Sequence, residues 1–141
     1  MHQPLFGFLL LVILPVVFVH PVALGDGPPV AALPKTGEQV YWEVCSACHA
    51  TGVNHAPRFG DRKRWAQLAE EGQAVVTAHG WVGVRAMPAR GGQPGLTLES
   101  FARAVVWMAG GAGIRWQAPD ATLMAAIREE EKKRMQKLAK H

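Results

Sequence analysis

Apolar residues recur at the spacing of an α-helix in several separate stretches of the chain, and no stretch alternates as a β-strand does. The first stretch begins at Thr36, which forms a Thr-x-x-Gln capping box with Gln39 and so satisfies free N–H groups at a helix start. Apolar side chains then follow along one helical face, at Val40, Tyr41, Val44, Ala47 and Cys48. The pattern predicts a helix that begins at residue 36 and continues into the two cysteines.

Two short helices are expected next, each bounded by residues that favour helix ends. Asp61 suits the N-cap of the second helix and Gly72 its C-terminal end, with one face formed by Trp65, Leu68 and Ala69. The third helix, over residues 73–79, is expected to bury Val75 and Val76. Residues 80–96 contain five glycines and two prolines, too many for a helix or a central strand. This segment is therefore predicted to be a long loop that other contacts must hold.

A fourth helix and a charged tail complete the predicted fold, which is all-α. Thr97 can cap the fourth helix, which ends at Gly110-Gly111 and whose apolar face carries Leu98, Phe101, Val105 and Met108 beside Ala102 and Ala104. After Pro119-Asp120 the tail is predicted to be a charged helix with two favourable i,i+4 pairs, Glu129 with Lys133 and Glu130 with Arg134. Its apolar stripe is thin, consisting of Leu123, Ile127 and Leu138.

The first 25 residues have the composition of an export signal. A continuous apolar run from Leu5 to Val19 precedes small residues, which predicts cleavage after Gly25. The positive region before the run is weak, so an uncleaved membrane anchor is the alternative, although Pro15 disfavours a membrane-spanning helix. Either outcome places the remaining chain in the periplasm. The expected organisation is a signal at 1–25, a Gly- and Pro-rich leader at 26–35, a core domain at 36–110, and a linker with the charged helix at 111–141.

The charge of the chain is small and local. The formal net charge is +4, and residues 128–141 supply +3 of it through six basic and three acidic side chains. Nucleic-acid binding is not indicated, because it needs a strongly basic domain or stripe. The balance fits a protein partner with an acidic face better, and membrane contact is expected only through an uncleaved signal.

Cys45, Cys48 and His49 form a C-x-x-C-H motif. On a helix the two thiols lie at i and i+3 and face the same side, so both can add to the vinyl groups of one porphyrin while His49 reaches its iron. Export favours this covalent haem c, because lone cysteines in an oxidising compartment would otherwise form a disulfide. A zinc site lacks further ligands at suitable spacing, and a redox dithiol lacks a preceding strand. These two readings and a plain disulfide are the alternatives.

Met87 is the candidate for the second axial ligand of the iron. It lies in the predicted loop as Ala86-Met87-Pro88, where iron ligation would hold an otherwise flexible segment. A stray surface methionine is the alternative. His55 lies too near His49 in sequence to span the ring easily, and His79 suits the polar face of the third helix. The other histidines and methionines fall in the signal, on a core stripe or in the tail: Met1, His2, His20, Met108, Met124, Met135 and His141.

Taken together, these residues resemble a bacterial class I c-type cytochrome, and most specifically cytochrome c5. The likeness rests on GEQVYWEVCSACHATGVNHAPRFGDRKRWAQ (Gly37 to Gln67) and on VGVRAMPARGG (Val82 to Gly92). It implies thioether bonds from Cys45 and Cys48, with His49 and Met87 as axial ligands. One departure is that the cytochrome c5 pattern often has a second cysteine pair after the RGG string, and this chain has none.

The same resemblance assigns roles to residues around the predicted haem. The carbonyl of Pro57 is expected to accept the Nδ1–H of His49, which fixes a ligand imidazole. Trp65 is expected to line the haem edge or a propionate, with ordinary core packing as the alternative. Gly37 and Trp107 are expected to meet where the first and last core helices cross, with Tyr41 and Phe101 nearby.

His/Met ligation fills the coordination sphere of the iron, so the predicted function is single-electron transfer between redox partner proteins rather than enzymatic turnover. A docking face for an acidic partner is expected at Arg58, Arg62, Lys63, Arg64, Arg85 and Arg90. One alternative is a fixed cytochrome subunit of a larger oxidoreductase, attached through the C-terminal helix. If Met87 is not a ligand, the alternative is a haem enzyme or a gas sensor.

Overall fold

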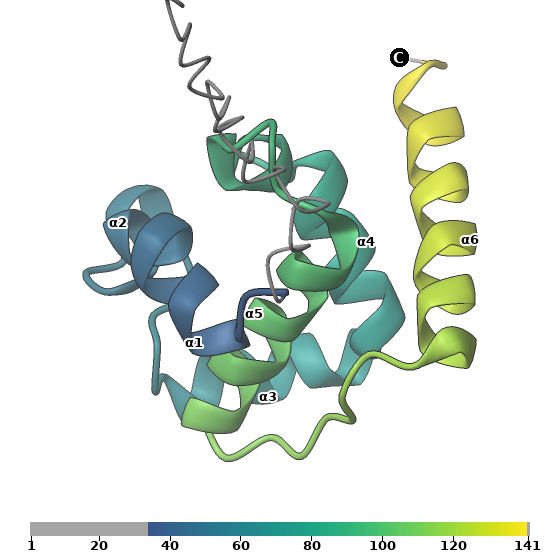
Figure 1. Ribbon diagram of the computed structural model, residues 1–141. Helices are drawn as coiled ribbons and strands as arrows, with labels where there is room; N and C mark the ends of the chain where they lie inside the picture. The colour runs from purple at the N-terminus through teal and green to yellow at the C-terminus, as the bar shows by residue number, and fades with distance from the viewer. Residues whose placement is uncertain (1–33, 141) are drawn as a thin grey trace, which may run out of the picture. The chain divides into compact units, whose positions relative to one another are not determined.

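The computed structural model describes residues 34–140, which form helices and turns but no β-strand. The expected signal and most of the expected leader lie outside this range. Within it the longer helices are α3 (Arg62–Glu71), α4 (Gln73–Val82), α5 (Leu98–Gly111) and α6 (Ala121–Leu138), preceded by the short α1 (Gly37–Val40) and α2 (Ser46–His49) (Figure 1). None of the helices in this range is both long and apolar enough to cross a membrane. The all-α prediction is confirmed.

The first helix starts as predicted but changes its winding before the cysteines. Thr36 and Gln39 form both hydrogen bonds of the capping box. A π-helical turn, Tyr41–Cys45, then separates α1 from α2. Because a π turn adds a residue relative to an α turn, the face of the helix that points inward shifts along the sequence. Cys45 and His49 are buried, whereas Ala47 and Cys48, predicted on the apolar stripe, are exposed.

Helix α1 crosses α5 closely at Gly37, as the family resemblance implied. A Cβ on Gly37 would overlap the carbonyl oxygen of Arg103 and lie 3.1 Å from the Cβ of Trp107. Only glycine permits this approach between the two backbones. Beside the crossing, the ring of Phe59 lies 5.0 Å from that of Tyr41 and 6.3 Å from that of Trp107. The crossing therefore fixes the direction in which the first helix carries its cysteines.

Helix α4 is longer than the sequence predicted. Residues 80–82 were expected in a loop, yet the helix continues to Val82 and buries Gly80 and Trp81. Gly80 lets the helix approach Phe101 of α5, because a Cβ there would lie 3.0 Å from the Phe101 Cζ. The Trp81 ring also packs edge-on against Phe101, with 5.6 Å between ring centroids. Tertiary packing thus outweighs the low helix propensity of glycine. Val75 and Val76 are only half-buried, not buried as expected.

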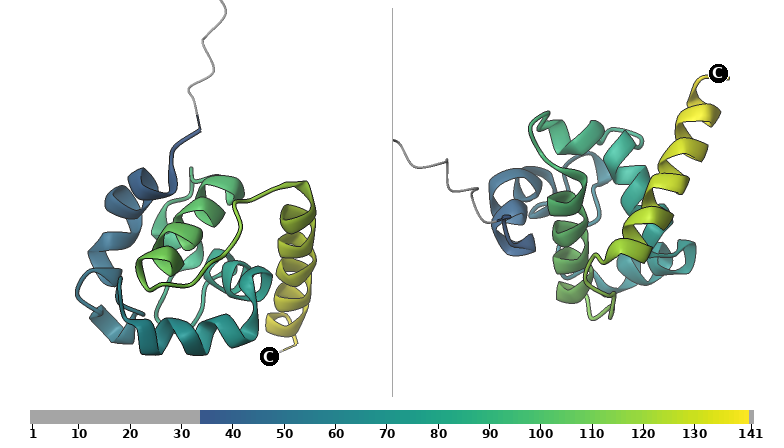
Figure 2. Two further views of the ribbon diagram at one scale, coloured as in Figure 1. Left: turned by 90° about the horizontal axis from the view of Figure 1, so that it is seen from below. Right: turned by 45° about the vertical axis from the view of Figure 1, so that its right-hand side comes forward.

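Helix α6 lies along α4 and contributes to the core (Figures 1 and 2). Asp120 caps it by accepting a hydrogen bond from the N–H of Leu123. Leu123 and Ile127 are buried, whereas Leu138 is 51% exposed. The two predicted i,i+4 pairs are wrong: the pairs formed are i,i+3, Glu129 with Lys132 and Glu130 with Lys133. Arg134 does not pair with Glu130, because its guanidinium is directed toward the end of α4 and donates to the Gly83 carbonyl.

Candidate cofactor site

A cavity of about 1050 Å³ lies between the first helix, the loop after it, α3, α4, the loop after α4, α5 and α6. Small-molecule sites commonly measure about 300–1,000 Å³, so this one has room for a ligand as large as a tetrapyrrole. Every site residue predicted from the sequence lines it, namely Cys45, Cys48, His49, Pro57, Trp65 and Met87. Most of its remaining wall is apolar, formed by Val44, Leu68, Val76, Val84, Phe101, Val105 and Met108.

The two cysteines reach the cavity from the same short helical segment. Cys45 ends the π turn and is buried, and burial raises the pKa of its thiol to about 11. Cys48 lies in α2 and is exposed, and neither cysteine forms a disulfide. Between residues 34 and 140, no three His, Cys, Asp or Glu side chains come together as a metal site would require.

His49 is buried and its ring is held by the following loop. Its Nδ1 lies 2.7 Å from the carbonyl oxygen of Pro57, the contact expected from the sequence resemblance. A carbonyl can only accept, so Nδ1 carries the proton and Nε2 keeps a lone pair for another partner. The loop itself is fixed to the helix, because the N–H of Phe59 donates to the carbonyl of His49 at 2.8 Å.

Trp65 is packed in the core and also lines the cavity. The residue is 2% exposed within the core cluster, and its ring also lines the cavity. Its Nε1–H donates to the carbonyl of Arg58 at 3.0 Å. An indole has one donor, so this bond uses the only N–H of the Trp65 side chain and leaves its ring to line the cavity. The same bond connects α3 to the loop that holds His49.

Met87 closes a tight turn directly after α4. The N–H of Val84 donates to the carbonyl of Met87 at 3.0 Å, and the N–H of Met87 donates to the carbonyl of Val84 at 2.9 Å. Gly83, with φ of +102°, permits the chain to reverse at the end of the helix. Its absent side chain also makes room, because a Cβ there would lie 3.3 Å from the Met87 carbonyl oxygen. Met87 itself is half-buried.

The other ligand-type side chains at the cavity have other surroundings. His55 is exposed with a positive φ of +63°. His79 is half-buried, with its Nδ1 3.6 Å from a carboxylate oxygen of Glu71. Burial, helped by the nearby Arg134, lowers the pKa of His79, so the ring favours its neutral form. Met108 is buried in the core of α5, as predicted.

Cationic side chains also line the cavity, and one was missed from the sequence. Arg58, Arg64 and Arg85 come from the predicted docking group, whereas Arg134 comes from α6. Arg62, Lys63 and Arg90 of that group do not line the cavity, although all three are exposed. Arg134 was predicted to pair with Glu130 on the helix surface. A local i,i+4 pattern could not show that the end of α4 lies within its reach.

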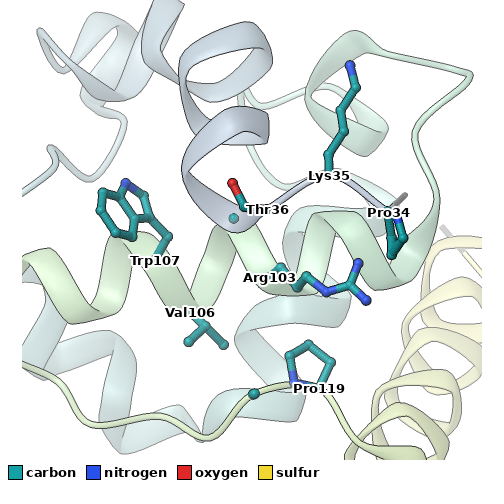
Figure 3. Close-up of a pocket in the computed structure, with 9 residues that line it drawn as sticks. Pro34, Lys35, Thr36, Arg103, Val106, Trp107 and Pro119 are labelled. Carbon is teal, nitrogen blue, oxygen red and sulfur yellow. The ribbon is translucent and has the colours of Figure 1, made fainter. Parts of the chain in front are cut away.

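A second, smaller pocket of about 370 Å³ lies where the start of α1 meets α5 (Figure 3). Lys35, Arg103, Trp107 and Pro119 are among the residues that line it. Arg103 is ion-paired with Glu99 of the same helix. The described residues of this pocket include no cysteine, histidine or methionine, so the first cavity is the candidate site.

Comparison with known proteins agrees with this geometry. Residues 32–108 match the family model described as cytochrome C oxidase, cbb3-type, subunit III. The chain is 38% identical over 78 residues to cytochrome c-555 of Chlorobaculum thiosulfatiphilum, spanning 52% of this chain and 91% of that protein. It is 36% identical over 59 residues to cytochrome c5 of Azotobacter vinelandii, spanning 40% of this chain and 71% of that protein.

One solved structure is also similar, a chain from an electron-transfer complex of nitrite reductase with cytochrome c. The likeness has a TM-score of 0.52 at 37% identity and covers 54% of this chain and 93% of that one. The matches therefore concern about half of the chain, and the family match ends at residue 108, before α6 begins.

Proposed function

Because this chain belongs to the class I c-type cytochromes, which bind haem c covalently and transfer electrons rather than act as enzymes, we propose that it carries single electrons through an iron held by His49 and Met87. The observation that supports this proposal is one cavity lined by both cysteines, His49 and Met87. These four residues come from two segments about 40 positions apart, so their meeting depends on the fold.

The residues around the cavity fit haem c by number and chemistry. Two thiols on one helical segment supply two thioether bonds, and the free Nε2 of His49 and the thioether of Met87 supply one nitrogen and one sulfur ligand. When bound, haem supplies a one-electron Fe(III)/Fe(II) couple. A His/Met pair raises its reduction potential relative to two nitrogen ligands and leaves no coordination position for a substrate.

The surrounding side chains set the conditions for that couple. The Pro57 carbonyl orients His49 and increases its basicity by accepting the Nδ1–H. Trp65, Phe101, Val105 and Met108 exclude water from the inner wall, which disfavours the more highly charged oxidised form. Cys48 lies at the exposed side of the segment, so electrons are expected to enter and leave near it.

Export is the second part of the proposal. The apolar run and small-residue site before residue 26 favour a cleaved secretory signal and a periplasmic protein. Mass spectrometry of the exported protein would give its first residue, and a start at Asp26 is expected. Recovery of full-length chain in the membrane fraction would instead indicate an N-terminal anchor.

The partner is proposed to be a redox protein with an acidic face. The exposed cations Arg58 and Arg85 line the cavity, where they would attract such a face and speed encounter. The similar solved chain was crystallised with nitrite reductase, an example of a redox partner for that protein. The electron-transfer rate should fall as ionic strength rises, and a rate insensitive to salt would argue against the acidic face.

A fixed subunit of a larger oxidoreductase is the second candidate, favoured by the description of the matching family as an oxidase subunit. The two candidates differ in whether the holoprotein is isolated alone. Gel filtration at near-native concentration separates a free carrier, whose polypeptide is smaller than the 15.3 kDa of the uncleaved chain, from a subunit of a large assembly. Co-elution with other polypeptides would favour the subunit.

The proposed ligand set is tested by the optical spectrum of the oxidised holoprotein. A methionine-to-iron charge-transfer band is expected in the wild type and should be lost in Met87→Ala. Met135→Ala is the matched control, because Met135 is exposed on α6 and should leave the band unchanged. A wild type that lacks the band and binds carbon monoxide readily would overturn the proposal in favour of a haem enzyme or gas sensor.

A further inference from the structure

We infer that α6 is a built-in brace for the loop that carries Met87, and that Glu131 and Arg134 are positioning residues for the proposed methionine ligand. Together Glu131 and Arg134 form the α6 brace. The inference rests on the proposed function, since it assumes that Met87 is a ligand. It goes beyond the family resemblance, because the brace lies after residue 108, where the family match ends.

Arg134 forms the first contact of the brace. Its Nε and Nη2 both donate to the carbonyl oxygen of Gly83, at 3.1 and 2.6 Å. Gly83 is the C-cap of α4 and immediately precedes the Val84–Met87 turn. A carbonyl at a helix C-terminus lacks an intrahelical partner and carries partial negative charge, so a guanidinium there is stabilising. The bond fixes the point at which the Met87 loop leaves the helix.

Glu131 forms the second contact, one turn earlier on α6. Its carboxylate accepts the Nε1–H of Trp81 at 2.8 Å. The Trp81 ring also contacts Arg90. The guanidinium carbon of Arg90 lies 4.6 Å from the ring centroid, close enough for a cation–π contact. Arg90 follows Met87 by three residues. The brace thus acts before the Met87 turn through Gly83 and after it through Trp81 and Arg90.

Among the described residues, few other hydrogen bonds connect this loop to the rest of the chain. It carries no disulfide, since the chain has only two cysteines and both lie in the C-x-x-C-H motif. Within the loop, the hydrogen bonds are those of the 84–87 turn and short-range bonds over residues 88–96. Contacts from residues 131 and 134 close a chain segment of about 50 residues, and such long-range bonds restrict the loop more than local ones do.

The test is competition by imidazole, which binds the oxidised iron only when the methionine ligand leaves it. Arg134→Ala is expected to raise the apparent imidazole affinity of the holoprotein about tenfold, equivalent to about 1.4 kcal/mol. Arg134→Lys, which keeps the charge but loses the two-pronged bond, should give a smaller rise. Lys132→Ala is the matched control, because it removes one positive charge from an exposed position of the same helix.

A second readout separates positioning from general stability. Expressed as a free energy, the gain in imidazole binding by Arg134→Ala should exceed its loss of unfolding free energy, which urea unfolding at a helix-sensitive wavelength measures. Glu131→Ala should change both quantities in the same direction as Arg134→Ala. If the wild type shows the methionine band while Arg134→Ala and Glu131→Ala bind imidazole no better than Lys132→Ala, the brace is overturned and the ligand set stands. If the wild type lacks the band, the ligand set is overturned and the brace with it.

Discussion

The two proposed axial ligands are held by different kinds of contact. His49 is fixed by its own neighbourhood, through Pro57 eight residues later and a helix that is capped at Thr36. The loop that carries Met87 is placed by contacts between distant parts of the chain. Phe101 packs against Trp81 of α4, and the α6 brace contacts Trp81 and Gly83. The ring of His49 is thus held by a bond that is local in sequence, whereas the helix before Met87 is held by long-range bonds. Substitutions near His49 and substitutions near Met87 are therefore expected to differ in their effects on stability and on ligand exchange.

The largest expected effect comes from removing the covalent attachment on the His49 side. A Cys45→Ser and Cys48→Ser double variant should lose all covalently bound haem, because a serine hydroxyl does not add to a vinyl group as a thiol does. The ratio of haem to polypeptide after extraction in denaturant measures this loss. Retention of haem by the denatured variant would contradict the attachment through this motif.

The next effect should come from the crossing that supports the His49 side. Gly37→Val places a side chain against the Arg103 carbonyl and should lower the free energy of unfolding by about 1–3 kcal/mol. Gly110→Ala is a matched control, because a Cβ at Gly110 meets nothing within 4 Å. Urea unfolding of both variants gives the comparison. Equal stability of the two would show that the crossing tolerates a side chain.

The smallest effects give the sharpest comparison, since the same change can be made on each side. Trp65→Phe removes the hydrogen bond to the Arg58 carbonyl, and Trp81→Phe removes the one to Glu131. The first removes one of the two hydrogen bonds that the Arg58 carbonyl accepts, since the Asp61 N–H also donates to it, and shrinks a ring that is 2% exposed, so it should cost about 1.5 kcal/mol. The second leaves a carboxylate that water can reach and should cost about 1 kcal/mol or less.

Ligand exchange should reverse that order. Trp81→Phe weakens the contact between α6 and the Met87 loop, so its apparent imidazole affinity should rise more than that of Trp65→Phe. Thermal or urea unfolding and imidazole titration of the same two proteins measure both quantities. If the variant that loses more stability is also the one that gains more imidazole affinity, His49 and Met87 are not held by different kinds of contact.

The same contrast explains which features the sequence could predict. Thr36, Asp61 and Thr97 cap helices as expected, because a cap depends on residues three or four positions apart. The C-x-x-C-H motif and the stiffened loop methionine are local signals, whereas Pro57 and Trp65 were identified from the family resemblance; all six residues line one cavity. Tertiary packing was harder to foresee: Gly80 and Trp81 are helical because Phe101 packs on them.

Arg134 shows the limit most clearly. Its spacing from Glu130 predicted a surface pair, and only the position of α6 beside α4 brings it to Gly83. A charged side chain in this helix has several possible partners nearby in sequence, and the spacing rules favour them about equally. No rule based on neighbours along the chain ranks a backbone carbonyl 51 residues away above them.

Because of the π-helical turn at Tyr41–Cys45, the number of residues between Thr36 and Cys45 decides which way the C-x-x-C-H motif faces. Successive residues of an α-helix are rotated by about 100° around its axis. A single-residue deletion between Thr36 and Cys45 would therefore turn Cys48 and His49 away from the cavity by roughly that angle, while every motif residue remained present. Two chains with the same C-x-x-C-H letters could thus differ in whether they bind haem because of one residue of spacing upstream.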